Sequence, residues 1–355
     1  MRTPLTDFSQ DFCNALRPLK ASFGDVVEEL HESADEELEG ELMPDLRRVG
    51  DQLDVLLRKV EEQQAYVMIF GPLKSGKSTL INALMGSKVS IVTAKPQTTR
   101  HRILAVRTTG DTQVVFIDTP GLHRKANKAM NRMMNRTAAS ALADADLVLF
   151  VMEAGRWTEE DGDVLRRLEA VRAPVVAVLN KVDLVQPKEK LLAIIDEMSQ
   201  RREFAGIVPL SASRNDNLDA LTDLIPGHLP ESPHLFPSEM RTDRGIEFHA
   251  AEIIREKLTL SLHQEVPYGL TVQIERIDEG EAQTTINAVI WVERDSQKGI
   301  VVGKGGAVLK RIGREARLEL KEQLGRPVHL ELWVKVKDNW ADSEQDLLNL
   351  GYESP

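Results

Sequence analysis

Only one cysteine, Cys13, occurs among the 355 residues. A disulfide within the chain is therefore impossible, and this usage is typical of proteins from a reducing compartment. The sequence also lacks an apolar run of the roughly 18 residues that a membrane span needs, and its N-terminus lacks the apolar core of a signal peptide. These absences predict a cytoplasmic protein. The 42% of hydrophobic and 28% of charged residues exclude disorder as the dominant state.

Basic residues are the minority, 45 against 56 acidic ones, which gives a formal net charge of −11. This balance excludes a uniformly basic nucleic-acid coat but allows a local basic patch. The acidic excess is concentrated in residues 1–65, which hold 16 acidic and 7 basic side chains. Leucines at helical spacing predict an acidic extension of one or two amphipathic helices there, with a break or bend at Pro44. We expect it to contact the chain's own neighbouring domain or another partner.

The length predicts two or three domains. Beyond residue 65, short apolar runs alternate with amphipathic stretches. Continuous apolar runs are typical of strands buried on both faces, as in a parallel sheet with helices on each side. His101–Thr108 alternates better and is expected at the sheet edge. We therefore expect an α/β domain with further strands at Tyr66–Phe70, Val114–Ile117, Leu147–Met152, Val175–Leu179 and Ile207–Leu210.

A phosphate-binding motif follows the first of these strands. Gly71–Ser78 fits G-x-x-x-x-G-K-[ST] and precedes a helical stretch, Thr79–Met85. In this context the loop amides and the helix N-terminus bind phosphates. Lys77 is expected at the β- and γ-phosphates, and Ser78 on Mg²⁺. The residues expected to contact the nucleotide here are Gly71, Lys74, Ser75, Gly76, Lys77, Ser78 and Thr79.

An Asp-Thr-Pro-Gly turn, from Asp118 to Gly121, follows another expected strand. A carboxylate at a strand end can hold Mg²⁺, so Asp118 joins Ser78 as an expected metal ligand. The amide of Gly121 can reach a γ-phosphate because no side chain intervenes. In Ras-type enzymes a glutamine after this glycine orients the attacking water. Leu122 stands there instead, so we expect slow basal hydrolysis.

A candidate switch lies between these motifs, in Lys95–Arg100. A threonine in this segment can complete the magnesium shell only when a γ-phosphate is present, and the segment then responds to the nucleotide. Thr99 is favoured for this role, and Thr98 is the alternative. The expected catalytic residues are therefore Lys77, Thr99 and Gly121, and the expected metal ligands are Ser78, Thr99 and Asp118.

The base is expected to be read after the strand Val175–Leu179, where the chain continues Asn-Lys-Val-Asp. The carboxylate of Asp183 can accept hydrogen bonds from guanine N1–H and the 2-amino group, which adenine lacks, and a site built on such an acceptor rejects the wrong base. The residues expected around the base are Asn180, Lys181, Asp183, Ser211 and Ala212. Together the motifs predict GTP and GDP as the bound nucleotides and Mg²⁺-dependent GTP hydrolysis as the reaction.

Four prolines between residues 226 and 237 indicate a linker that resists regular structure. The elements change order beyond it. A helix, two strands, a second helix and a last strand predict an α+β domain. They are expected at Phe248–Leu262, Leu270–Arg276, Thr284–Glu293, Val308–Leu324 and Val328–Val336.

A Gly-x-x-Gly loop with a lysine inside opens the second of these helices. The KH module uses such a loop to clamp the backbone of single-stranded nucleic acid. Residues 298–317 hold six basic side chains and one acidic one, which is the local patch that the whole-chain charge conceals. The residues expected to bind RNA are Gly303, Lys304, Gly305, Gly306, Lys310, Arg311 and Arg314.

From about Ser87 to Tyr352 the chain resembles the Era family, bacterial GTPases of small ribosomal subunit assembly. The resemblance implies a P-loop GTPase domain followed by a type II KH domain, binding near the 3′ end of 16S ribosomal RNA, and peripheral contact with the inner membrane. The expected domains are a helical extension (1–65), the GTPase domain (66–228), a linker (229–240), the KH domain (241–340) and a tail (341–355). The matching stretches are Lys95–Arg102, Asp118–His123, Arg156–Thr158, Asn180–Asp183, Ser211–Ala212, Glu252–Leu258, Val302–Gly306 and Pro327–Lys337.

The front of the chain departs from that family, whose phosphate loop usually reads Gly-x-Pro-Asn-Val-Gly-Lys-Ser. The helical extension and the loop Gly71–Ser78 look more like a bacterial dynamin-like GTPase, which suggests a fusion near residues 85–90. A membrane-remodelling or scaffolding protein that assembles through its N-terminal helices is therefore an alternative, although the chain lacks the long helical stalk of such proteins. An RNA-binding protein with an inert GTP site is a third.

Lys74 stands where Era-like proteins often carry an asparagine, which in some relatives helps to hold a potassium ion beside the phosphates. Lysine removes the amide oxygen and brings a charge of its own. We therefore expect hydrolysis that is indifferent to potassium, whether the ammonium replaces the ion or points to solvent.

Overall fold

The computed structural model describes residues 65–121, 128–230, 234, 236–263 and 265–352. Among these, the chain from Tyr66 to Leu229 and the chain from Ser238 onward form one compact unit, which contains two β-sheets. The expected helical extension and Leu122 lie outside the described residues.

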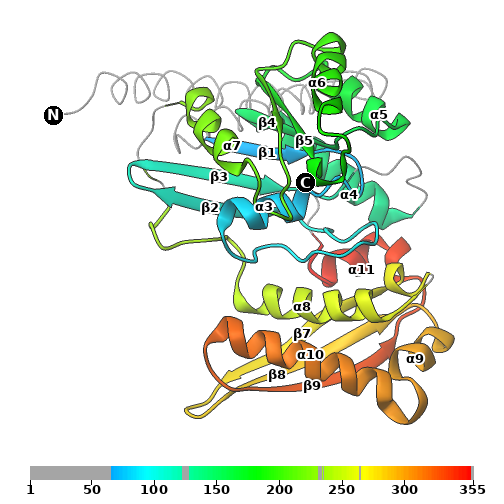
Figure 1. The fold of residues 1–355 in the computed structure, drawn as a ribbon. Coiled ribbons are helices and arrows are strands. Elements are labelled where there is room, and N and C mark those ends of the chain that lie inside the picture. The colour runs from blue at the N-terminus through cyan, green and yellow to red at the C-terminus, as the bar shows by residue number, and fades with distance from the viewer. Residues whose placement is uncertain (1–64, 122–127, 231–233, 235, 264, 353–355) are drawn as a thin grey trace, which may run out of the picture. The chain divides into compact units, whose positions relative to one another are not determined.

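The first sheet consists of β1 (Tyr66–Phe70), β2 (Ile103–Thr109), β3 (Thr112–Asp118), β4 (Leu147–Glu153), β5 (Val175–Asn180) and β6 (Gly206–Pro209). Its order is β2-β3-β1-β4-β5-β6 (Figure 1). All neighbours are parallel except β2, which pairs antiparallel with β3 at the edge. The predicted mostly parallel sheet is confirmed, with the strand expected at His101–Thr108 in its edge position.

Helices cover both faces of this sheet, because its strands are apolar on both sides. One face is covered by α3 (Lys77–Met85) and α7 (Leu218–Leu224), and the other by α4 (Ala129–Ala143), α5 (Glu159–Leu168) and α6 (Lys190–Arg201). The loops that carry the phosphate and base motifs leave the carboxyl ends of β1, β3 and β5. These ends meet at one edge of a parallel sheet, which is where such folds bind their ligands.

The first of the four clustered prolines, Pro226, lies in a regular turn. Residues Ile225–His228 form a 3-10 helix, with Pro226 in its first turn. A proline there has the right φ and lacks only an N–H that the helix start would leave unbonded. Ile225 is buried against the core next to α3, which holds this turn in place.

The second sheet belongs to a domain made of α8 (Ile246–Ser261), β7 (Leu270–Glu279), β8 (Thr284–Val292), α9 (Asp295–Val302), α10 (Ala307–Leu324) and β9 (Val328–Val336). β8 lies in the middle, antiparallel to β7 and parallel to β9. The apolar faces of α8 and α10 pack on one side of the sheet (Figure 1). The predicted helix, two strands, helix and strand are all present. Helix α9 is additional: it is short, contains Gly299 and shows no clear period.

The C-terminal segment forms η5 (Trp340–Asp342) and α11 (Glu344–Asn349). Trp340, Leu347 and Tyr352 are buried in a cluster with the methionines of α4. The carboxylate oxygen Oδ1 of Asp342 accepts a hydrogen bond of 2.8 Å from the backbone N–H of Ala129, the first residue of α4. The segment expected as a tail therefore contributes to the core of the described unit.

Deleting residues 1–65 should leave the described fold from Tyr66 onward intact. The first sheet begins at Tyr66, and its central strand β1 is buried by other described elements, which include α3, β3 and β4. We expect a soluble truncated protein whose melting temperature stays within a few degrees of that of the full chain. Circular dichroism and size-exclusion chromatography test this. Aggregation of the truncated protein beside a soluble full-length control would show that the extension belongs to the core.

Candidate nucleotide site and RNA-binding loop

Two glycines of the phosphate loop stand where no other residue fits. A Cβ added to Gly71 would lie 2.2 Å from the carbonyl oxygen of Val151. Gly76 has a φ of +93°, and a Cβ there would lie 2.4 Å from the amide nitrogen Nδ2 of Asn180. The loop therefore packs directly on β4 and on the end of β5, and α3 starts at Lys77, within the motif.

Lys77 is buried at the start of α3. Its ammonium donates hydrogen bonds to the carbonyl oxygens of Gly71 (3.0 Å) and Pro72 (2.8 Å). Burial lowers the pKa of Lys77 to about 8, although Asp118 and Glu160 act in the opposite direction. A phosphate brought next to this ammonium raises its pKa again, so nucleotide binding and protonation of Lys77 favour each other.

The three expected metal ligands come together. The hydroxyl oxygens of Ser78 and Thr99 are 2.7 Å apart, and Thr99 Oγ1 lies 3.5 Å from Oδ2 of Asp118. The other carboxylate oxygen of Asp118, Oδ1, is buried and has no hydrogen-bond partner among the described residues. Burial raises the pKa of Asp118, and Mg²⁺ would offset that cost. Two hydroxyls and a carboxylate are oxygen ligands of the kind that Mg²⁺ takes, so these residues fit the ion.

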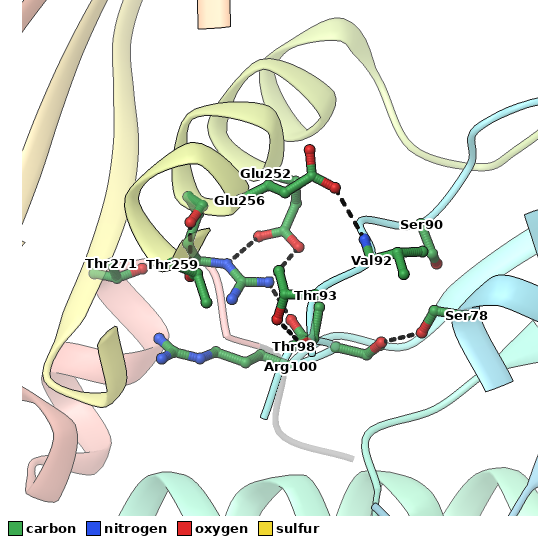
Figure 2. Close-up of polar contacts among 12 residues, drawn as sticks. Ser78, Ser90, Val92, Thr93, Thr98, Arg100, Glu252, Glu256, Thr259 and Thr271 are labelled. Atoms are coloured by element: carbon green, nitrogen blue, oxygen red, sulfur yellow. Dashed lines mark hydrogen bonds and ion pairs between the residues drawn. The ribbon is translucent and has the colours of Figure 1, made fainter. Parts of the chain in front are cut away.

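The geometry separates the two candidate threonines. The hydroxyl of Thr98 lies 2.7 Å from that of Thr93 (Figure 2) and donates to the carbonyl of Lys95 (2.8 Å). The hydroxyl of Thr99 instead approaches that of Ser78. Sequence reasoning missed Ser90, whose hydroxyl donates a 2.7 Å hydrogen bond to Oδ2 of Asp118. A lone serine in a loop carries no signal that would have indicated this contact.

Gly121 lies close to the phosphate loop, with no room for a side chain between them. A Cβ at this position would lie 2.5 Å from Cδ2 of Leu73 and 3.3 Å from the ammonium of Lys77. The backbone at Gly121 can therefore approach a phosphate held by Lys77. A cavity of about 430 Å³ collects most of the expected phosphate and metal residues. It is lined by Lys74, Gly76, Lys77, Ser78, Thr79, Thr99, Gly121 and Lys181, together with residues 91–98.

Asn180 joins the loops around the expected base site. Its Nδ2 donates to the carbonyl of Ser75 (2.9 Å), and its Oδ1 accepts from the backbone N–H of Ala212 (3.0 Å). Lys181 has a φ of +65°, and its ammonium lies 2.5 Å from the carboxylate of Glu153.

The carboxylate of Asp183 is prepared to accept hydrogen bonds. Its Oδ1 accepts one from the hydroxyl of Ser211 (2.6 Å), and its Oδ2 lies 3.5 Å from Nε of Arg214. The hydrogen bond from Ser211 lowers the pKa of Asp183, with smaller contributions from Arg214 and Lys181. Asp183 is therefore ionised at neutral pH and acts only as an acceptor.

The Gly-x-x-Gly loop connects α9 to α10 with three glycines in the left-handed region. Gly303, Gly305 and Gly306 have φ values of +72°, +60° and +78°. No atom lies within 4 Å of a Cβ added to Gly305 or Gly306, so the outer side of the loop is open to a ligand backbone. The loop ends at the N-terminus of α10, where unpaired amides favour phosphate. The expected cationic side chains are all exposed, at Lys304, Lys310, Arg311 and Arg314.

Replacing potassium by sodium should leave the hydrolysis rate unchanged. Lys74 has a φ of +63°, is exposed and lines the cavity with its charged side chain in place of an amide oxygen. A steady-state rate measurement in the two salts tests this, and marked stimulation by potassium would contradict it. The Lys74→Asn variant separates two cases: it lowers the rate in sodium if the ammonium contributes charge, and leaves that rate unchanged if it points to solvent.

The fold and the site define a P-loop GTPase joined to a KH domain. Two family models match: one described as 50S ribosome-binding GTPase over residues 66–181, and a KH domain over residues 265–341. GTPase Era of Vibrio parahaemolyticus is 48% identical over 289 residues, which cover 81% of this chain and 90% of the relative. GTPase Era of Pseudomonas fluorescens is 46% identical over 287 residues, covering 81% and 96%.

Two solved structures are also similar to this chain. A crystal structure of Era with MgGDPNP and nucleotides 1506–1542 of 16S ribosomal RNA has a TM-score of 0.79 and 39% identity, covering 81% of this chain and 98% of that one. An Aquifex aeolicus Era variant bound to GDP.AlF4- has a TM-score of 0.78 and 40% identity, with the same coverage. The chain belongs to the Era family of GTPases. The matched GTPase family model starts at residue 66 and thus includes the phosphate loop.

Proposed function

We propose that this GTPase binds single-stranded 16S ribosomal RNA through its KH domain and acts in assembly of the small ribosomal subunit. The observation that carries the proposal is the open glycine loop at the N-terminus of α10, flanked by exposed cationic side chains. A relative of 39% identity was crystallised with a 16S ribosomal RNA fragment, which supports the same RNA for this chain.

The site residues are assigned these roles. Lys77 binds the β- and γ-phosphates, the amide of Gly121 binds the γ-phosphate, and Ser78, Thr99 and Asp118 hold Mg²⁺. When bound, Mg²⁺ neutralises charge on the phosphates. Because the ammonium of Lys77 already lies at the phosphate loop and Gly121 has no side chain between its backbone and that ammonium, both donors are in place before the transition state forms.

The base is assigned to the loops after β5 and β6. Asp183 accepts from guanine N1–H and the 2-amino group, Lys181 covers the ring face, and Asn180 keeps the phosphate loop and the Ser211–Ala212 loop in register. These roles require that GTP and GDP bind and ATP does not.

Two measurements test the proposed function. A GTP hydrolysis time course should show slow, Mg²⁺-dependent turnover. The absence of any turnover would instead favour an RNA-binding protein whose GTP site is inert. Pelleting with purified ribosomal subunits should place the chain with the small subunit. Pelleting only with the large subunit, to which the name of the matched GTPase model refers, would contradict the proposed partner.

The membrane-associated alternative predicts a different outcome. Among the described helices none has the length and apolarity to cross a bilayer. Peripheral contact with the inner membrane and assembly through the extension, residues 1–65, rest on resemblance alone. A liposome pelleting assay beside the subunit assay separates the two roles, because the alternative requires binding to vesicles without RNA.

A further inference from the structure

Helix α8 of the KH domain holds both ends of the segment that carries Thr99. Near the start of this segment, Oε1 of Glu256 accepts a hydrogen bond of 3.0 Å from the backbone N–H of Val92 (Figure 2). Near its end, Nη2 of Arg255 donates to the carbonyl oxygen of Thr98. Two adjacent residues of one helix therefore hold two points of the loop between α3 and β2 that are six residues apart in sequence.

Further hydrogen bonds hold the segment around Thr99 against the KH domain at several points. The ammonium of Lys95 donates to the carbonyl of Thr259 (2.5 Å) and to that of Leu262, at the C-terminal end of α8 where carbonyls lack partners. The guanidinium of Arg100 donates to the carbonyls of Leu270 (2.7 Å) and Pro267 (2.9 Å). All of these contacts join the GTPase domain to the KH domain.

Arg255 differs from the other anchors because it is itself held rigidly. Its Nε donates to Oε1 of Glu252 (2.7 Å) and its Nη2 to Oε2 (2.6 Å). Both side chains are buried, with 2% of Arg255 and 7% of Glu252 exposed. Burial opposes ionisation of Glu252, but the charge and hydrogen bonds of Arg255 outweigh it and lower the pKa of Glu252. The pair is therefore ionised and fixed in geometry.

The carbonyl that Arg255 holds belongs to the same peptide unit as the nitrogen of Thr99. This unit is planar, so fixing its carbonyl limits the orientation of the next residue. Thr99 Oγ1 lies 2.7 Å from Ser78 Oγ in this arrangement. The buried ion pair thus contacts the backbone at Thr98, the residue directly before the expected magnesium ligand Thr99.

We propose that Arg255 is a positioning residue for the nucleotide site: it holds the carbonyl of Thr98 so that the hydroxyl of Thr99 faces Ser78 and Asp118. The proposal rests on the proposed role of Thr99 as a metal ligand. Because that role exists only with a γ-phosphate, Arg255 supports the triphosphate state and not the diphosphate state. A KH-domain residue then sets how well the GTPase domain distinguishes GTP from GDP.

The test is equilibrium binding, measured with a fluorescent non-hydrolysable GTP analogue and with fluorescent GDP over a range of Mg²⁺ concentrations. The Arg255→Lys variant keeps the positive charge but loses the planar guanidinium that binds Glu252 and the carbonyl of Thr98 together. We expect its affinity for the GTP analogue to fall about tenfold at limiting Mg²⁺, as for the loss of one charge-assisted hydrogen bond, and its affinity for GDP to stay within about twofold. Equal losses for both nucleotides would reveal a merely structural role and overturn the proposal.

Two further variants make the result specific. Lys95→Gln loosens the same loop from the same helix through a side chain that does not contact Thr98, and it keeps the backbone carbonyl to which the hydroxyl of Thr98 donates. Its selective loss should therefore be under about threefold; a loss equal to that of Arg255→Lys would overturn the assignment to Arg255. Glu252→Gln combined with Arg255→Gln removes both buried charges together, leaves no unpaired ion, and should reproduce the selective loss even if Arg255→Lys folds poorly.

Thr99→Ala separates this proposal from the proposed function. If Thr99→Ala binds the GTP analogue and GDP as the parent does, the metal role of Thr99 is wrong. If Thr99→Ala loses the analogue selectively and the Arg255 variants do not, only the positioning role of Arg255 is wrong. Thermal unfolding of every variant, followed by circular dichroism, verifies that the losses are measured on folded protein.

Discussion

The Asp183→Asn variant is expected to lose GTP and to prefer xanthosine triphosphate. The parent carboxylate is ionised and accepts from Ser211, which leaves acceptor capacity for guanine N1–H and the 2-amino group. Asparagine instead offers an N–H₂ donor, which suits the O2 of xanthine and repels the amino group of guanine. Losing two charge-assisted hydrogen bonds should weaken GTP by about a thousandfold.

Competition binding with GTP, xanthosine triphosphate and ATP measures the change. Recovery by xanthosine triphosphate is the internal control, because a collapsed site would bind neither nucleotide. Arg214→Gln serves as a matched variant: its side chain touches the same carboxylate from an exposed position, 69% accessible, and its loss should cost less than about fivefold. An unchanged GTP preference in Asp183→Asn would refute the base assignment.

Gly305→Asp is expected to abolish RNA binding and to leave basal GTP hydrolysis nearly intact. The φ of +60° at Gly305 is a conformation that aspartate tolerates better than most residues, and no atom lies within 4 Å of the added Cβ. The fold should therefore survive. The new carboxylate would face the phosphates that the loop amides and Lys304 attract, and its bulk would prevent close approach of the RNA backbone.

Gly325→Asp is the matched control for this substitution. Gly325 has a φ of +64°, has open space around its Cβ position, and lies at the opposite end of α10. The Gly325→Asp substitution therefore introduces the same backbone strain and the same change of charge, but at a position outside the Gly-x-x-Gly loop. Filter binding to single-stranded 16S ribosomal RNA at moderate salt should lose at least about tenfold for Gly305→Asp and less than about twofold for Gly325→Asp. RNA binding that survives in Gly305→Asp would place the clamp elsewhere.

The phosphate and base loops were predictable because each is a contiguous motif after a buried strand. Continuous apolarity locates β1, β3 and β5, and the residues that follow them carry the chemistry, so sequence order alone places Lys77, Asp118 and Asp183 at one edge of a sheet. Helix α9 was missed for the opposite reason. Its eight residues are too few to show a 3.6-residue period, and the apolar run before Gly303 looks the same in a helix as in a strand.

The sequence by itself determined the two domains, their order, the nucleotide loops and the glycine loop, because these depend on local periodicity and on backbone conformations that only glycine adopts freely. Only the tertiary structure decided that Ser90 holds Asp118, that Arg255 reaches Thr98, and that the C-terminal segment packs on α4. Such contacts join positions far apart in the chain, and a serine, a buried arginine or a tryptophan has no pattern that indicates which distant group it meets. Their partners are set by how the two sheets and their helices pack, which follows from the whole core rather than from any one segment.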